Sequence, residues 1–572
     1  MGARRAPPLR GLLAALALAV PGCAGGEQPS TRAEGVGSAA ATAFDASNDI
    51  NATRRDRLQD GGTLTWPLDQ WPPNFNAGHL DGALSDNVAV VNALLPSPFH
   101  FDAAGRPILN HDLVVSAELT STDPQVVTYR VNPQARWYDG TPITVADFEA
   151  QWKARNGSDP DFHVASTQGY DKIASVAQGR NELEVVVTHR EPFADWRSVF
   201  SGLYPASTNR DPAVFNRGWA ERPLTSAGPF RLQRLDQAAQ TITLVRNERW
   251  WGAPAKLDRI AYRVIAPDAQ FDALANGEVD FVEVGPDVDK LRRAQMAPGV
   301  AVRRAAAPDY RHLTFNGTSE ALGDVQVRRA LALAIDRQTI ARALIGPLGV
   351  PARPLNNHIF MANQAGYRDN AGDLGSPAPE RAKAMLDATG WRAAGPVRTK
   401  DGKELALRLV IPSHVRTSRH EAKLVQEMLA GVGVEVDIHS VPAADFFERY
   451  ITPGNFDLTL FSWVGTVFPI SSATSIYAQP SPGGDGRLDV GQNYGRIGSD
   501  EIDRLFDEAT AAFDRARANE LGNEIDALIW QEVHSLTLYQ RPEIVAARED
   551  LANVGAFGFA TLRYEDMGYL ER

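Results

Sequence analysis

Apolar residues recur along this chain in two patterns, an alternation with a period of two and a stripe with the period of a helix. The first pattern predicts strands at 63–66, 113–119, 126–131, 182–188, 230–235, 241–246, 259–265, 279–284, 301–305, 312–316, 434–441 and 536–546. The second predicts helices at 87–95, 144–154, 268–276, 325–344, 376–390, 418–430, from Ser499 onward, and over 521–533. Because helices and strands alternate throughout, we expect an α/β fold with mixed sheets and more than one lobe.

Several element ends have recognisable signals. Thr144 followed by Asp147, and Ser418 followed by Glu421, have the spacing of capping boxes at helix N-termini. The run 325–344 keeps helical spacing throughout and predicts one long helix. Pro67 is expected to end the first strand.

The stretch from 455 to 477 (NFDLTLFSWVGTVFPISSATSIY) begins as an alternating strand and then loses its pattern. The irregular part, Trp463 to Pro469, is aromatic and uncharged. Such a segment usually lies against something other than water. Two interpretations stay open at this point, a core strand that runs into a buried turn and a segment that contacts a ligand.

The first 60 residues predict export and tethering rather than a fold. Three arginines precede an apolar run of about ten residues, which is too short to span a bilayer and is typical of a signal peptide over 1–22. The small residue before Cys23 resembles the bacterial lipobox, so Cys23 is the predicted lipidation site. Residues 23–60 are small and polar, and we expect them to form a flexible tether.

Composition excludes several classes of function. At 572 residues the chain is long enough for two to four domains, and 44% hydrophobic with 22% charged residues is ordinary for a globular protein. The net charge of −12 argues against nucleic acid as a partner and against electrostatic adhesion to anionic lipid. A single cysteine rules out an intramolecular disulfide.

No motif for catalysis, nucleotide binding or metal binding is found. The chain lacks the G-x-S-x-G elbow, the S-x-x-K motif, the P-loop and the G-x-G-x-x-G fingerprint. The closest histidines of the folded part, His414 and His420, do not have metal-ligand spacing. Paired carboxylates that meet only in the fold stay possible. We therefore expect no catalytic residue, no metal and no cofactor.

Five motifs in order resemble the extracellular solute-binding proteins of ABC importers, specifically the dipeptide/oligopeptide-binding family. They are RWYDGTPITVADF at 136–148, GPF at 228–230 with VRNERWWG at 245–252, ALANGEVD at 273–280, HLTFN at 312–316, and DVQVRRAL with AIDR between 324 and 337. The resemblance extends from about Gly62 to near the C-terminus.

The resemblance implies a two-lobed, periplasmic-binding-protein-like clamp that closes on a ligand by hinge motion. The implied first lobe combines residues 61–95, 222–308 and 541–572, with a small domain inserted at 96–221, and the second lobe is 309–540. It also implies a monomer, lipid-anchored at the outer face of the cytoplasmic membrane. This monomer would deliver oligopeptides to an ABC permease and its ATPase subunits.

The resemblance places ligand contact on the stretch described above. The predicted ligand-binding residues are Ser462, Trp463, Val464, Gly465, Thr466, Val467, Phe468, Asn76 and Asn316. The family typically has an Asp three residues after the Trp, which pairs with the α-ammonium of the peptide, but here Thr466 stands in its place. Either another acid, such as Asp69 or Asp81, takes the amine or the ligand has none there.

Other functions stay open from the sequence. An oligosaccharide, a modified peptide or a metal chelate is an alternative ligand, and Thr466 favours such a cargo. A receptor that senses extracellular peptide without importing it, and a lipid-anchored hydrolase, are the remaining alternatives. From the sequence we expect Trp463→Ala to weaken ligand binding and to change the melting temperature of the ligand-free protein little.

Overall fold

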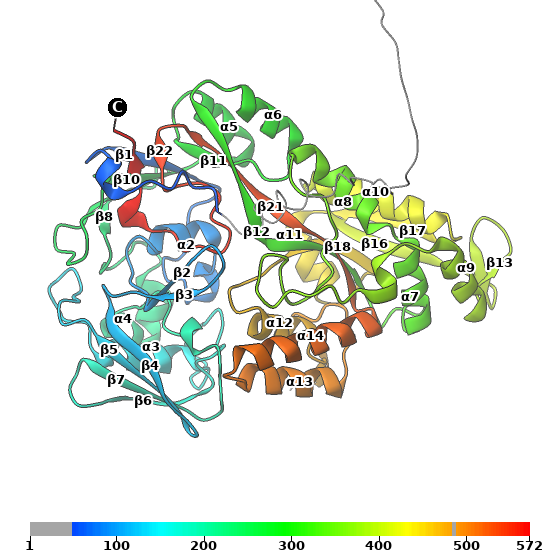
Figure 1. The fold of residues 1–572 in the computed structure, drawn as a ribbon, viewed down its shortest axis with the longest axis horizontal. Coiled ribbons are helices and arrows are strands. Elements are labelled where there is room, and N and C mark those ends of the chain that lie inside the picture. The colour runs from blue at the N-terminus through cyan, green and yellow to red at the C-terminus, as the bar shows by residue number, and fades with distance from the viewer. Residues whose placement is uncertain (1–47, 483–487, 572) are drawn as a thin grey trace, which may run out of the picture. The chain divides into compact units, whose positions relative to one another are not determined.

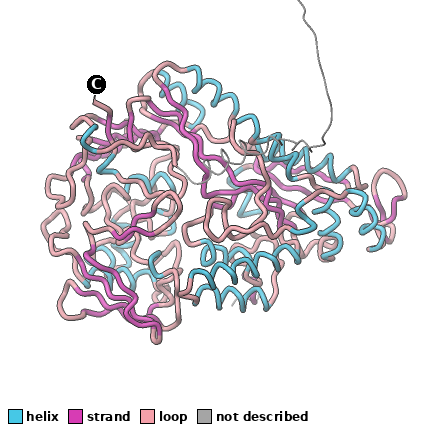
Figure 2. Tube along the Cα trace, viewed as in Figure 1, coloured by secondary structure: helices cyan, strands magenta, loops and turns pink. Residues whose placement is uncertain are grey.

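Two four-stranded sheets, one six-stranded sheet and the helices that connect their strands form the framework of the described residues (Figures 1 and 2). A computed structural model describes residues 48–482 and 488–571, so the signal peptide, Cys23 and residues 24–47 of the predicted tether lie outside the described residues. The prediction of a flexible tether is wrong for the described part, since Asp49 pairs with Ala556 and the buried Leu58 pairs with Leu570. The described residues belong to one unit that begins at Ala41. No helix among them has the length and apolar character needed to cross a membrane.

Two four-stranded sheets share the first hydrophobic core. One has the order β1-β10-β9-β8, with strands β1 (Thr63–Leu68), β10 (Arg259–Val264), β9 (Thr241–Arg246) and β8 (Phe230–Asp236). The other has the order β4-β5-β7-β6, with strands β4 (Val114–Thr122), β5 (Gln125–Val131), β7 (Glu184–His189) and β6 (Ile173–Gln178). Both contribute to one cluster of buried side chains, together with residues from the C-terminal segment 545–569.

A six-stranded sheet forms the second core. Its order is β11-β21-β12-β18-β16-β17, with strands β11 (Phe281–Glu283), β21 (Ser535–Arg548), β12 (Val300–Phe315), β18 (Leu458–Val464), β16 (Ala406–Pro412) and β17 (Glu435–Val441). Its pairs β16–β17 and β16–β18 are parallel and β12 pairs antiparallel with β18 and β21, so the sheet is mixed, as predicted.

Helices connect and cover the strands. The longer ones are α2 (Ser85–Val91), α3 (Val145–Arg155), α5 (Pro267–Ala275), α6 (Val288–Met296), α7 (Val325–Ala334), α8 (Arg337–Leu344), α9 (Pro379–Ala388), α10 (Arg416–Ala430), α12 (Pro469–Tyr477), α13 (Asp500–Ala511) and α14 (Arg515–Glu532). Helices α12, α13 and α14 pack on one another around a separate small core (Figure 1). This three-helix group directly follows the candidate stretch in the chain.

Strands β12 and β21 join the two large cores. Ala305 on β12 and Ala547 on β21 are buried in the first core, whereas Leu313 and Leu536 on the same strands are buried in the second. Residues 271–294 also pack in the second core, together with the six-stranded sheet. The domain boundaries given from the sequence stay a prediction.

Four of the predicted elements are wrong in detail. The runs 301–305 and 312–316 form one strand, β12, because β21 pairs along it on both sides of a register shift near Pro308. Pro67 lies inside β1 rather than ending it, since β1 is an edge strand and an edge tolerates a missing donor. The predicted helix 325–344 is two helices, α7 and α8.

The break between α7 and α8 has a local cause. Ile335 has extended backbone angles, φ −92° and ψ 114°. Asp336 then accepts hydrogen bonds from the Thr339 amide at 2.9 Å and the Thr339 hydroxyl at 2.6 Å, so it is the N-cap of α8. The apolar period runs through the break and therefore did not reveal it.

One of the two predicted capping boxes is confirmed. Thr144 and Asp147 form both hydrogen bonds of the box at the start of α3. The Ser418–Glu421 box is wrong, because α10 begins at Arg416 and both side chains lie inside the helix. Glu421 is instead the buried partner of Arg311 on β12.

Candidate functional site

The candidate stretch leaves the six-stranded sheet at Val464, the end of β18. Four connecting residues follow, and α12 begins at Pro469. Within the sheet Trp463 is the register partner of Tyr310 on β12. Pro469 occupies the first turn of α12, where its missing N–H costs no hydrogen bond. Residues 465–468 are thus a short connection held at both ends by regular structure.

Trp463 is half-buried in a stack of three rings. Its indole lies nearly parallel to the His312 imidazole and to the Tyr494 phenol, and each of these rings has its centroid 5.8 Å from that of the indole. Phe461 meets it edge-on at 5.1 Å. The packing of Trp463 therefore supports the core interpretation at this position.

Gly465 lies against the backbone of β12. Its N–H donates to the Pro308 carbonyl at 2.7 Å. A Cβ at this position would lie 2.6 Å from the same carbonyl oxygen, closer than real Cβ contacts come. Glycine is thus required here by close approach between two backbone segments.

We expect Gly465→Ala to lower the free energy of unfolding by about 1–3 kcal/mol, because the methyl group must push the connection away from Pro308. The measurement is chemical denaturation of the ligand-free protein. The neighbouring Val464→Ala is the control, since Val464 is 70% exposed. Equal stability of the two variants would contradict the expectation.

Thr466 is exposed and serves the start of α12. Its hydroxyl accepts from the Phe468 amide at 3.0 Å and hydrogen-bonds to the Ser472 hydroxyl at 3.2 Å. Its carbonyl accepts from the Gln364 side chain at 2.8 Å. Thr466 thus holds the start of α12 through hydrogen bonds and contributes no charge.

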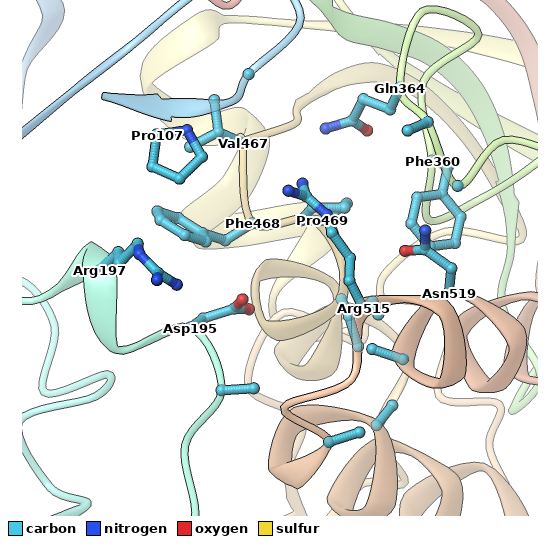
Figure 3. Close-up of a pocket in the computed structure, with 18 of the residues that line it drawn as sticks. Pro107, Asp195, Arg197, Phe360, Gln364, Val467, Phe468, Pro469, Arg515 and Asn519 are labelled. Carbon is cyan, nitrogen blue, oxygen red and sulfur yellow. The ribbon is translucent and has the colours of Figure 1, made fainter. Parts of the chain in front are cut away.

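Val467 and Phe468 line a cavity of about 140 Å³ (Figure 3). One wall comes from residues 104–107 and 194–197, which belong to the part of the chain around the β4–β7 sheet. The other comes from residues 360–366 and 509–519. The cavity is therefore enclosed by both large parts of the molecule, with the candidate stretch between them.

Direct contacts join the two sides around this cavity. The Gln168 side-chain amide donates to the Ser471 carbonyl, and the Ala194 N–H donates to the Thr510 carbonyl, both at 2.8 Å. Phe101 and Phe468 meet edge to face at 5.5 Å. The two sides thus touch in this structure.

Three charged side chains line the cavity, Asp195, Arg197 and Arg515 (Figure 3). Burial raises the pKa of the Asp195 carboxyl, although hydrogen bonding to Ser471 and the two guanidinium charges oppose the rise. Burial also lowers the pKa of Arg197. None of the three residues is predicted from the sequence, since they come from separate segments without a shared motif.

A second cavity of about 460 Å³ lies beside the end of β18. Phe461 and Ser462 line it together with Phe446, Phe447 and Arg541. Arg311 at its wall is held by Glu421 and donates to the Ser462 hydroxyl at 3.4 Å. Of the predicted site residues, Ser462 thus faces this cavity, whereas Val467 and Phe468 face the first.

The two predicted asparagines lie apart from both cavities. Asn76 donates to the Phe215 carbonyl at 3.0 Å and accepts from the Gly78 amide at 3.0 Å. Asn316 donates to the carbonyls of Gly454 and Phe456 and accepts from Thr318. These hydrogen bonds favour structural roles, and ligand contact by either residue stays a prediction.

The two acids considered as replacements at position 466 are exposed and line neither cavity. Asp69 accepts from the Gln270 side chain at 2.7 Å, and Asp81 lies 3.8 Å from the His79 ring nitrogen. Within 48–482 and 488–571, no three His, Cys, Asp or Glu residues are grouped so as to hold a metal ion.

The sequence profile of the bacterial extracellular solute-binding proteins, family 5 (Middle), matches residues 109–485. The chain belongs to this family. The resemblance inferred from the five motifs is confirmed.

Named relatives of this solute-binding protein cover nearly its whole length. The oligopeptide-binding protein OppA of Mycobacterium tuberculosis is 42% identical over 534 residues, 93% of this chain and 88% of that protein. Among solved structures, the periplasmic EDTA-binding protein EppA is 28% identical with a TM-score of 0.83, covering 92% of this chain and 99% of EppA. The oligopeptide-binding protein AppA of Bacillus subtilis, solved with a nonapeptide, is 21% identical with a TM-score of 0.72, covering 90% and 100%.

These structural likenesses confirm the fold class. The solute-binding protein is a two-lobed, periplasmic-binding-protein-like α/β molecule with mixed sheets. The family and the relatives named above are binding proteins rather than enzymes. Which residues contact the ligand stays a prediction.

Proposed function

We propose that this protein captures oligopeptides between its two lobes and delivers them to an ABC permease and its ATPase subunits. The observation that carries the proposal is the cavity beside Val467 and Phe468, which has walls from both sides of the molecule. The similarity to OppA over 93% of the chain supports a peptide as the cargo. Acylation of Cys23 would hold the monomer at the outer face of the cytoplasmic membrane.

The size of the cavity bears on how a peptide would bind. About 140 Å³ is small beside the roughly 300–1,000 Å³ of pockets that enclose a whole drug-sized ligand. It therefore suits one side chain or one end of a longer ligand. The cavity of about 460 Å³ beside Ser462 could take a further part of the same ligand.

A second candidate cargo is a non-peptide solute that carries several carboxylates, such as a metal chelate. The similarity to EppA, whose name states that it binds EDTA, favours this candidate. The uncharged Thr466 also favours it, because this position offers no carboxylate to a peptide amine.

Native mass spectrometry of the protein purified without its signal peptide tests the proposal by identifying whatever co-purifies. We expect a heterogeneous series of short peptides. A small cavity that binds one side chain or one end of a peptide selects little among residues at the other positions. A single non-peptide species would overturn the proposal and support the second candidate.

A further inference from the structure

Two guanidinium groups face the cavity beside Val467 and Phe468, here named the interlobe cavity, from opposite walls. Arg197 belongs to the wall formed by 194–197, and Arg515 lies at the first turn of α14. Neither side chain has a hydrogen bond or an ion pair to any of the described residues. In Figure 3 Arg515 extends from α14 across the cavity, with Arg197 and Asp195 on the far side.

Arg197 is held in position by aromatic rings. Its guanidinium carbon lies 4.2 Å from the Trp196 ring centroid and 5.9 Å from that of Phe99. Stacking of this kind orients the plane of the group while leaving its N–H donors free. Half-burial weakens solvation of this charge and lowers the pKa of Arg197. The group is thus both oriented and poorly solvated.

Asp195 is the one acidic side chain among the described residues that line the cavity, and a single carboxylate offsets at most one of the two guanidinium charges. Its carboxylate is engaged with Ser471 at the start of α12, and its pKa is raised by burial. The other polar side chains lining the cavity, Gln364 and Asn519, are uncharged. With one acid against two guanidinium groups, the cavity has an excess of positive charge in a protein whose net charge is −12.

We propose that this cavity is a subsite for a carboxylate of the ligand, bound between Arg197 and Arg515. Guanidinium groups bind carboxylates through paired N–H donors, and such charge-assisted hydrogen bonds are about twice as strong as neutral ones. Because the two arginines belong to opposite sides of the cavity, a bound carboxylate links the two lobes and stabilises their contact. The inference rests on the proposed function, since it names the class of peptide that the site prefers.

The carboxylate has two sources in a peptide, an acidic side chain and the C-terminus. Four tetrapeptides with a single Glu at each position of an otherwise all-Ala sequence, and their four Gln counterparts, differ only in side-chain charge. Each is prepared with a free and with an amidated C-terminus. Isothermal titration calorimetry then measures the affinity of the ligand-free protein for each.

We expect at least one Glu peptide to bind about 10-fold more tightly than its Gln counterpart, or the free C-terminus to bind about 10-fold more tightly than the amide. The first result assigns the subsite to a side chain and the second to the C-terminus. Equal affinities across the whole set would overturn the carboxylate subsite while leaving peptide capture intact. Binding of none of the peptides would overturn the proposed function and the subsite that rests on it.

Variants locate the effect in this cavity. Arg197→Gln and Arg515→Gln are each expected to abolish the preference for the charged peptide and to change the affinity for the uncharged one less than 2-fold. Arg517→Gln is the matched control, because Arg517 lies on the same helix, pairs with Glu520 and Glu524, and does not line the cavity. A preference that survives both cavity variants, or that is equally lost in the control, would overturn the assignment.

Discussion

Replacing Glu421 by alanine is expected to lower the free energy of unfolding by about 3–5 kcal/mol, because it leaves the buried guanidinium of Arg311 without its counter-charge. The Arg311 Nε donates to both carboxylate oxygens, at 3.0 and 3.1 Å, and the Tyr539 hydroxyl donates to the same carboxylate at 2.5 Å. The side chains of Arg311 and Glu421 are only 6% and 0% exposed. Chemical denaturation of the ligand-free protein measures the loss.

Glu501→Ala is the control for the loss of one carboxylate. Glu501 pairs with Arg504 on the surface of α13, and the two side chains are 54% and 51% exposed. Exposed pairs contribute about 0–1 kcal/mol, so this variant should remain close to the parent protein. A Glu421 variant as stable as the Glu501 variant would show that the Arg311–Glu421 pair does not hold α10 to the sheet.

The second large effect is expected at Trp463. Trp463→Ala should lower the free energy of unfolding of the ligand-free protein by about 2–3 kcal/mol, less than the roughly 3–5 kcal/mol of a fully buried tryptophan, because the ring is half-buried. The loss arises from the stacking of Trp463 with His312 and Tyr494, which holds the end of β18. This expectation replaces the one drawn from the sequence alone, which had the ligand-free protein little affected.

Trp463→Phe separates packing from ligand contact. A phenyl ring keeps part of the stack, so the stability of the ligand-free protein should return most of the way to that of the parent protein. Thermal unfolding without ligand and peptide affinity by calorimetry are measured side by side. An unchanged melting temperature for Trp463→Ala would contradict the packing role given to the ring stack.

Much of the fold could be predicted from local pattern. Strands such as β5, β9 and β17, and the capped helix α3, follow from side-chain periodicity and end signals within a few residues. The errors arose where tertiary contacts override the local pattern. Glu421 illustrates this, since its spacing from Ser418 has the form of a capping box while its carboxylate is taken by Arg311, 110 residues away in the chain.

The candidate site was only partly predictable for the same reason. Val467 and Phe468 could be suggested because their segment is uncharged and aromatic, and the structure places both at the interlobe cavity. Arg197 and Arg515 could not be suggested, since a lone arginine in a loop or at a helix start is ordinary on a protein surface. Their significance is that both face the same cavity and that neither forms a hydrogen bond or an ion pair with any other described residue.

The sequence by itself determined the family and the alternating α/β character, and it indicated residues 455–477 as a candidate site. Motifs, periodicity and composition carry this information because they are properties of neighbouring residues. Only the tertiary structure showed that different residues of this stretch have different roles. Trp463 packs in a ring stack, Gly465 touches β12, and Val467 and Phe468 line the cavity. Alternation along a strand gives the two faces but not what covers each face, which is set by segments that are distant in the chain.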